Sequence, residues 1–144
     1  MGYRVTFAIG ILGLSCLFGG CGGGTDGPPR FQVSGTVKFK GAAVPAGEIC
    51  LEPDASKGNT GPMVVIPIKN GSYATEATHG MVSGPVVVRI SGTDGVPTTL
   101  PGGMDMPNGK SLFTEYQTTG TVATDKAGTK LDFDVPEAAP ARRK

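Results

Sequence analysis

The stretch FQVSGTVKFK, residues 31–40, decides the fold. Its apolar and glycine residues occupy alternate positions, and polar residues occupy the positions between them. Alternation with period two over ten residues predicts a β-strand with one face toward a core and the other toward water. The inward set is Phe31, Val33, Gly35, Val37 and Phe39, and the outward set is Gln32, Ser34, Thr36, Lys38 and Lys40.

Similar alternation continues downstream. EICLEP (48–53) places Ile49 and Leu51 inward and Cys50 on the outer face, partly exposed. PMVVIPIKN (62–70) and GPVVVRISG (84–92) are further strands, with Val64, Ile66 and Ile68 in phase in the first and Val86, Val88 and Ile90 in phase in the second. Asn70-Gly71 predicts a tight turn into a short strand. Pro67 predicts an edge strand or a bulge, because proline cannot donate to a β-ladder.

The last patterned segment, residues 119–135 (TGTVATDKAGTKLDFDV), predicts a hairpin. In it Leu131, Phe133 and Val135 face inward, and Lys130, Asp132 and Asp134 face outward. Seven or so strands, with no helix after residue 20, favour an all-β sandwich. Glycine (24) and proline (12) make up a quarter of the 144 residues, as expected for many short strands joined by turns.

The N-terminus has the pattern of an export signal. Residues 1–4 carry one positive charge, and residues 5–20 form an uncharged, mostly apolar run that ends in two glycines. This run of 16 residues is shorter than the roughly 20 that a membrane-spanning helix requires. A charged start, an apolar middle and a small-residue cleavage site predict a signal peptide over residues 1–20.

Cys21, directly after Gly19 and Gly20, resembles the lipobox cysteine of bacterial lipoproteins. The resemblance implies that Cys21 receives lipid (diacylglyceryl and palmitate) and becomes the mature N-terminus. Phe18 stands where leucine is usual, with Leu17 one step back, and Cys16 is a rival position. A secretory peptide without lipid is the alternative. Attached acyl chains contribute about 0.8 kcal/mol per buried CH₂, so that two chains anchor durably.

Several further stretches, VSGTVKFKGAAVPAGEICLEPD (33–54), NGSYAT (70–75), GPVVVRISG (84–92), LFTEYQ (112–117) and KLDFDV (130–135), resemble the carboxypeptidase regulatory-like domain of small bacterial lipoproteins. The resemblance covers residues 31–136 and implies a transthyretin-like sandwich of seven or so strands without an active site. Residues 21–30 are then a lipidated tether, and residues 137–144 a disordered tail. The Gly/Pro/Met-rich segment TTLPGGMDMPNGKS (98–111) departs from the family pattern.

The sequence offers little support for a catalytic site or a metal site. His79 is the only histidine, and no Gly-x-Ser-x-Gly elbow occurs, so a base paired with a nucleophile is missing. Asp125, Asp132 and Asp134 are carboxylates of a solvated strand and its turn, because a hard cation needs six or more oxygen ligands. Copper(I) suits thioether and imidazole ligands, so a weak metal hypothesis joins the residues His79, Met81, Met104 and Met106.

Two further features bear on function. Residues 92–110 form an unpatterned stretch, which predicts either a recognition loop or a disordered segment. The net charge is +1, without a basic block, which excludes the usual nucleic-acid footprint. Without Cys16 and with Cys21 lipidated, Cys50 alone remains, so that no internal disulfide forms.

These observations predict a non-enzymatic lipoprotein at a bacterial cell envelope, on the extracytoplasmic side. Its sandwich would serve binding or structural support toward an envelope protein or a glycan, with membrane lipid holding Cys21 and no cofactor. Gly22, rather than Asp, follows Cys21 and would favour the outer membrane if the host has two membranes. An exported copper-binding protein, or an accessory subunit of an envelope enzyme, is the alternative.

Overall fold

The computed structural model describes residues 27–76, 78–113 and 115–137. The predicted signal peptide (1–20), most of the tether (21–30) and residues 138–144 of the predicted tail lie outside these ranges, as does Cys21 with its neighbours Cys16, Leu17 and Phe18. Within the described part of the chain no helix has the length and hydropathy needed to cross a bilayer.

The described residues form thirteen strands and one 3₁₀ turn, η1 (Ala55–Lys57), and no α-helix. Four of the strands contain only two residues, which is why the number exceeds the seven or so expected. The strands are β1 (Arg30–Phe31), β2 (Val33–Phe39), β3 (Ala42–Ala43), β4 (Ala46–Pro53), β5 (Val64–Lys69), β6 (Ser72–Ala74), β7 (Met81–Val82), β8 (Gly84–Thr93), β9 (Thr98–Leu100), β10 (Met104–Met106), β11 (Tyr116–Val122), β12 (Thr129–Lys130) and β13 (Phe133–Val135).

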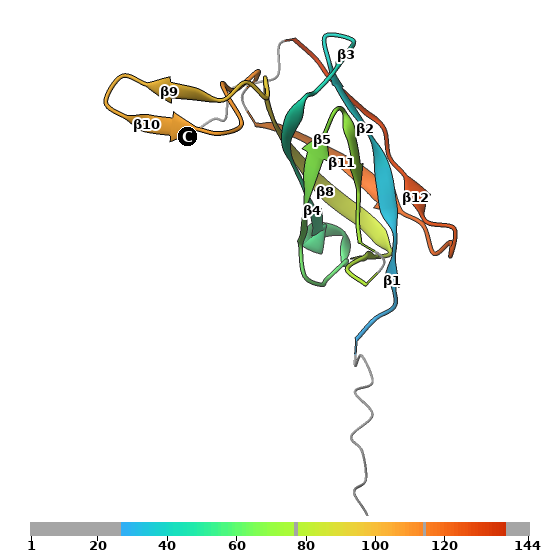
Figure 1. Cartoon of the computed structure of the whole chain (residues 1–144). Helices are drawn as coiled ribbons and strands as arrows, with labels where there is room; N and C mark the ends of the chain where they lie inside the picture. Colours follow the sequence, from blue (N-terminus) through green and yellow to red (C-terminus); the bar gives the residue numbers. More distant parts are fainter. Residues whose placement is uncertain (1–26, 77, 114, 138–144) are drawn as a thin grey trace, which may run out of the picture.

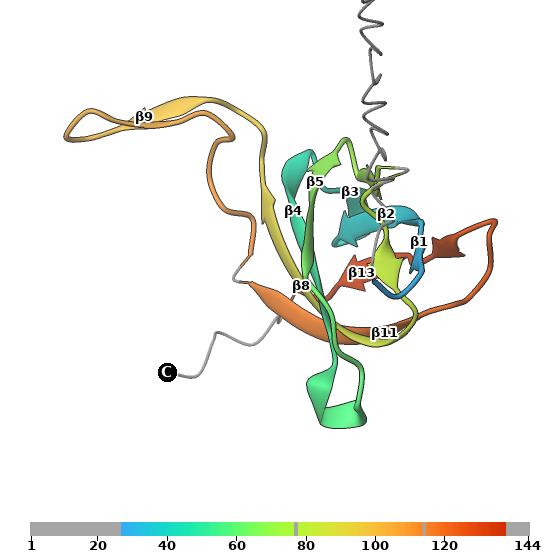
Figure 2. The same cartoon turned by 90° about the horizontal axis from the view of Figure 1, so that it is seen from below.

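The body is one long sheet that curls on itself to form an all-β sandwich. Its order is β11-β8-β4-β5-β6-β2-β12, with β3 and β13 also paired to β2. Figure 2 shows β11, β8, β4 and β5 along one wall and β2 with β13 across from them. The alternation in residues 31–40 is confirmed, since Val33 and Val37 are fully buried while Phe31 and Phe39 pack partly buried against the core.

The core is filled by the inward residues that the periodicity predicts. The fully buried members from β4 and β8 are Ile49, Leu51, Val86, Val88 and Ile90. Ile66 and Ile68 of β5 are also buried, and Cys50 is half-buried on the outer face as expected. The packing is closed by aliphatic side chains because aromatic residues are few and tryptophan is absent.

The hairpin predicted over residues 119–135 is wrong. β11 pairs antiparallel with β8, whereas β12 and β13 both pair parallel with β2. The segment therefore crosses from one wall of the sandwich to the other rather than folding back on itself. Alternation along a strand fixes which face is buried, but it does not specify the partner strand.

Residues 92–110 contain paired strands, which differs from the expectation of a disordered segment. β8 extends to Thr93, and β9 and β10 pair antiparallel as a separate two-stranded sheet. We call residues 94–110 the arm. It projects from the end of the body opposite to β1 (Figure 1).

Candidate functional site

A groove lies between β5 and β6 in the body. Its volume is about 460 Å³. One wall consists of residues 63–67, the other of residues 74–76, and Arg30 and His79 contribute from the mouth. We call this hollow the seam groove, because it lies where the two walls of the sandwich meet.

The seam groove exists because the β5–β6 hairpin opens directly after its turn. Asn70 and Gly71 form the turn with φ angles of 49° and 75°, the left-handed geometry that an Asn-Gly hairpin favours. Only one register pair, Lys69 with Ser72, joins the two strands. Beyond it β5 continues along β4 for the whole of its length, and β6 turns to pair with β2.

The direction of the backbone groups on β5 follows from its turn. The Asn70 N–H donates to the Pro45 carbonyl over 2.9 Å, toward the β4 side. Backbone groups alternate along a strand, so those of Lys69, Pro67 and Val65 point away from β4. Lys69 is paired with Ser72, which leaves the Val65 N–H and C=O and the Pro67 C=O facing the groove. β5 stands between β4 and β6 in the sheet and pairs with both, so the prediction of an edge strand holds only beyond the Lys69–Ser72 pair, where Pro67 has no partner on the β6 side.

The opposite wall also presents backbone groups to the groove. The Thr75 N–H donates to the Val33 carbonyl over 2.8 Å, and Val37 N–H donates to the Gly71 carbonyl over 2.8 Å. Residues 71, 73 and 75 therefore face β2, and the N–H and C=O of Ala74 face the groove. Ala74 is an exposed residue on this wall of the groove.

Apolar side chains dominate the β5 wall. Met63 is 59% exposed and Val65 is 50% exposed, and they are two of the four large hydrophobic residues that the described chain leaves exposed. Ile66, which alternates with them, is buried in the core. Exposed apolar side chains beside unpaired backbone groups characterise an edge that can accept another strand.

His79 lies at the mouth of the groove in a short turn. The ring Nδ1 is 2.9 Å from Thr78 Oγ1 and 3.3 Å from Glu76 Oε2. The backbone N–H of His79 donates to the Glu76 carbonyl over 3.1 Å. The nearby Thr75 hydroxyl is buried and accepts the Val33 N–H over 3.0 Å. His79 is thus held at a solvated rim, and Thr75 serves the sheet rather than a reaction.

The copper hypothesis joined residues that the fold does not bring together. Met81 is fully buried in β7, which pairs with β1 at one end of the body. Met104 and Met106 belong to the arm at the other end (Figure 1), and Met104 is 67% exposed. In the described ranges no three His, Cys, Asp or Glu residues cluster as metal ligands would.

The carboxylates singled out in the sequence stabilise local structure. Asp132 Oδ1 accepts the Thr36 N–H over 2.9 Å and the Thr36 hydroxyl over 2.8 Å, and its Oδ2 lies 3.2 Å from Lys130 Nζ. The Thr36 hydroxyl, followed by Lys130, holds the pKa of Asp132 below its usual value. Asp125 accepts the Ala127 N–H over 2.9 Å within a turn, and Asp134 is exposed opposite Lys38.

A second, shallower hollow of about 290 Å³ lies on the outer face of β4, β5 and β8. Cys50 Sγ is 3.8 Å from Met63 Sδ, and Cys50 stands opposite Arg89 in the β4–β8 register. Arg89 Nη1 binds Glu52 Oε2 at 2.6 Å, and this hydrogen bond raises the pKa of Arg89. The guanidinium is thus already neutralised by a carboxylate of the adjacent strand.

Sequence reasoning identified His79 and Pro67 but missed Arg30, Met63, Val65 and Ala74 as parts of one site. Pro67 and the Asn70-Gly71 turn are the only local signals of an open hairpin. Comparison of the chain with protein-family models, with curated proteins and with solved structures found no match to any of them.

Proposed function

We propose that the protein is a lipid-anchored, extracytoplasmic lipoprotein whose sandwich is a non-catalytic binding module at a bacterial cell envelope. The pattern of residues 1–21 supports the anchor: an apolar run, two glycines and Cys21. The resemblance to carboxypeptidase regulatory-like domains, and with it a transthyretin-like arrangement of the strands, belongs to the same proposal.

The observation that carries the binding role is the seam groove. It combines unpaired strand backbone with exposed apolar side chains on the β5 wall. The described chain enters the body through β1 at the groove end, and the arm extends from the other end (Figure 1). A lipid on Cys21, followed by the linker 22–30, would therefore hold the groove end nearer the membrane and the arm farther from it.

Replacement of the lipidated thiol tests the anchor. We expect Cys21→Ser to release the protein from the membrane fraction, because serine cannot form the thioether. Cys16→Ser is the matched control and should leave the protein membrane-bound. Mass spectrometry of the mature N-terminal peptide should show a diacylated Cys21. An unmodified Cys21, or membrane retention of Cys21→Ser, would refute the anchor.

A further inference from the structure

The seam groove has two walls, and both offer backbone hydrogen-bonding groups. Val65 supplies an N–H and a C=O from the β5 side, and Ala74 supplies the same pair from the β6 side, by the alternation described above. The Pro67 C=O adds one more acceptor on the β5 wall. Paired donors and acceptors at strand spacing are the groups by which an extended polypeptide is added to a sheet.

The shape of the groove selects a single free strand rather than the edge of another folded sheet. The β5 edge is faced by β6 across the groove, and the strands converge at the Lys69–Ser72 pair. A second copy of this chain would have to bring its own β6 against the same wall. A short, extended segment has no such neighbour and enters through the open end, at Met63, Glu76 and Arg30.

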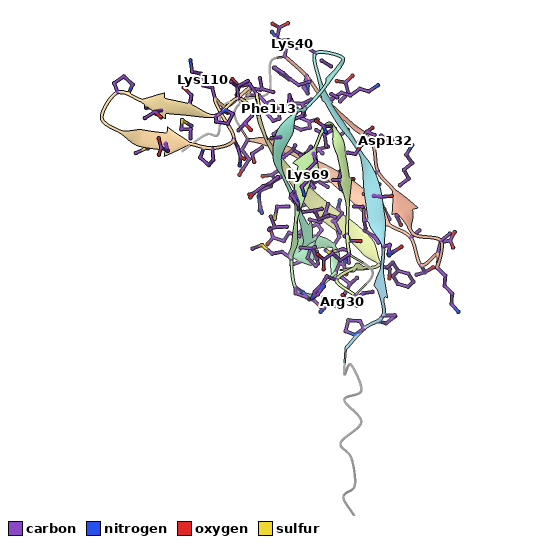
Figure 3. The ribbon with its side chains drawn as sticks, in the orientation of Figure 1. Arg30, Lys40, Lys69, Lys110, Phe113 and Asp132 are labelled. Carbon is purple, nitrogen blue, oxygen red and sulfur yellow. The ribbon has the colours of Figure 1, made fainter. Side chains whose placement is uncertain are left out.

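The charged side chains at the mouth of the groove indicate the charge of the segment that it binds. Arg30 is exposed, and it forms no ion pair within the described residues. The Glu76 carboxylate lies beside His79, 3.3 Å from the ring. Figure 3 shows Arg30 at the end where the tether leaves the body, with Lys69 nearer to the arm end. A carboxylate at one end of the bound segment would complement Arg30, and uncharged residues would suit the exposed side chain of Val65 in the middle.

We propose that the seam groove binds an extended peptide segment of a partner protein by strand addition to β5, with uncharged central residues and an acidic group that meets Arg30. The inference rests on the binding role proposed above but not on the lipid. It predicts that peptide affinity depends on backbone amides with a period of two residues along β5, because alternate amides of an added strand face β5, and on one intervening amide where the segment meets Ala74.

The test uses the full chain purified in detergent and a phage-displayed library of random dodecapeptides as the probe. Synthetic copies of the enriched peptides are then methylated at one backbone nitrogen at a time. Methylation should weaken binding at least about tenfold at every second position, where it removes a hydrogen bond to β5. Between these positions it should have little effect, except at the one amide that meets Ala74. This experiment leaves the protein unchanged, so misfolding cannot explain the pattern.

Two variants test the walls of the groove. Val65→Pro removes the edge N–H at a position equivalent to that of Pro67, and should weaken the peptides about tenfold or more. Arg30→Gln should weaken acid-bearing peptides about three- to tenfold at low salt, whereas Lys110→Gln, which removes an exposed cation at the root of the arm, should change affinity less than about twofold.

Three results would overturn the proposal. The first is that no peptide binds the parent protein better than the Val65→Pro variant. The second is that the methylation effects along β5 lack a period of two. The third is that the parent binds no peptide but forms a dimer, which is lost in Val65→Pro. The last would assign the edge to a second copy. None of these depends on Cys21, so failure of the anchor and failure of the groove are distinguishable.

Discussion

The body and the arm are both built from paired β-strands, but burial distinguishes them. β8 passes from one to the other: Val86, Val88 and Ile90 are fully buried, and four residues after Ile90 the chain enters the arm at Asp94. No residue of β9 or β10 is buried. The body is stabilised by apolar packing and the arm only by its ladder and its base, so strand formation and contribution to stability are separate properties.

The base of the arm is held by a single carboxylate. Asp94 Oδ1 accepts the Val96 N–H and the Lys110 N–H, each over 3.0 Å, and Asp94 N–H donates to the Lys110 carbonyl over 3.0 Å. Lys110 marks this position at the root of the arm in Figure 3. These bonds join the two ends of the arm to each other at its root.

Gly35→Ala should lower the stability of the fold most, because Gly35 in β2 lies against the backbone of Leu131. A Cβ at Gly35 would lie 1.8 Å from the Leu131 carbonyl oxygen, so the backbone of one strand must move. We expect a loss of more than about 3 kcal/mol of unfolding free energy, measured by urea denaturation. Gly27→Ala, with nothing within 4 Å, is the control and should unfold like the parent.

The variants Ile90→Ala and Met104→Ala compare how much the body and the arm contribute to the unfolding free energy. Removing the fully buried Ile90 side chain should cost about 2–5 kcal/mol, through lost burial and the cavity left behind. Met104, 67% exposed in β10, should change the unfolding free energy by less than about 0.5 kcal/mol. Equal losses in the two variants would show that the arm packs as part of the core.

Tyr73→Phe should have an intermediate effect in the body. The Tyr73 hydroxyl donates to the Leu131 carbonyl over 2.7 Å, and burial raises the pKa of this phenol above its ordinary value. Loss of the bond leaves a carbonyl without its donor and should cost about 1–2 kcal/mol. Tyr116→Phe is the matched control in thermal denaturation. An unchanged melting temperature in Tyr73→Phe would mean that water replaces the hydroxyl.

Asp132→Asn should produce a smaller effect that depends on pH. Because the folded state lowers the pKa of Asp132, its ionised form stabilises the fold above the unfolded pKa of about 3.9, and this contribution is lost as pH falls through the folded value. The parent should melt higher than Asp132→Asn at pH 7, and the difference should shrink below about pH 4. Asp134→Asn is the exposed control on the same strand face.

Asp94→Ala should have the smallest global effect and the largest local one. Loss of the carboxylate frees the Val96 and Lys110 amides, so hydrogen exchange should accelerate in residues 94–110. The melting temperature of the body should change by less than about 2 °C, since the arm contributes no buried residue from its strands. Accelerated exchange in β4 or β8 would contradict the separation of the two regions.

Prediction from the sequence succeeded for strands in which the apolar residues alternate because one face of the strand is buried. Residues 31–40 and 84–92 alternate because one face is packed, and the inward set can be recognised without knowing any partner strand. The arm escaped prediction for the opposite reason: neither face of β9 or β10 is buried, so TTL and MDM leave no period to detect. KLDFDV showed its inward face correctly, but its parallel pairing with β2 depends on residues 96 positions away.

The candidate site was still less accessible to prediction. Pro67 signalled an edge, but the seam groove depends on β6 leaving β5 after one pair, and that departure is set by the pairing of Ser72–Ala74 with β2. Arg30 joins the mouth only because β1 pairs with β7. These are relations between distant segments, and no local pattern carries them.

The parallel pairing of β2 with β12 and β13 also governs the order of assembly. One edge of the strand whose alternation decided the fold stays open until residues 129–135 have left the ribosome, since its partners on that edge lie 96 residues further along the chain. Such high contact order slows folding to the millisecond-to-second range typical of β domains. For a chain that is exported as proposed, this delay favours translocation before the sandwich closes.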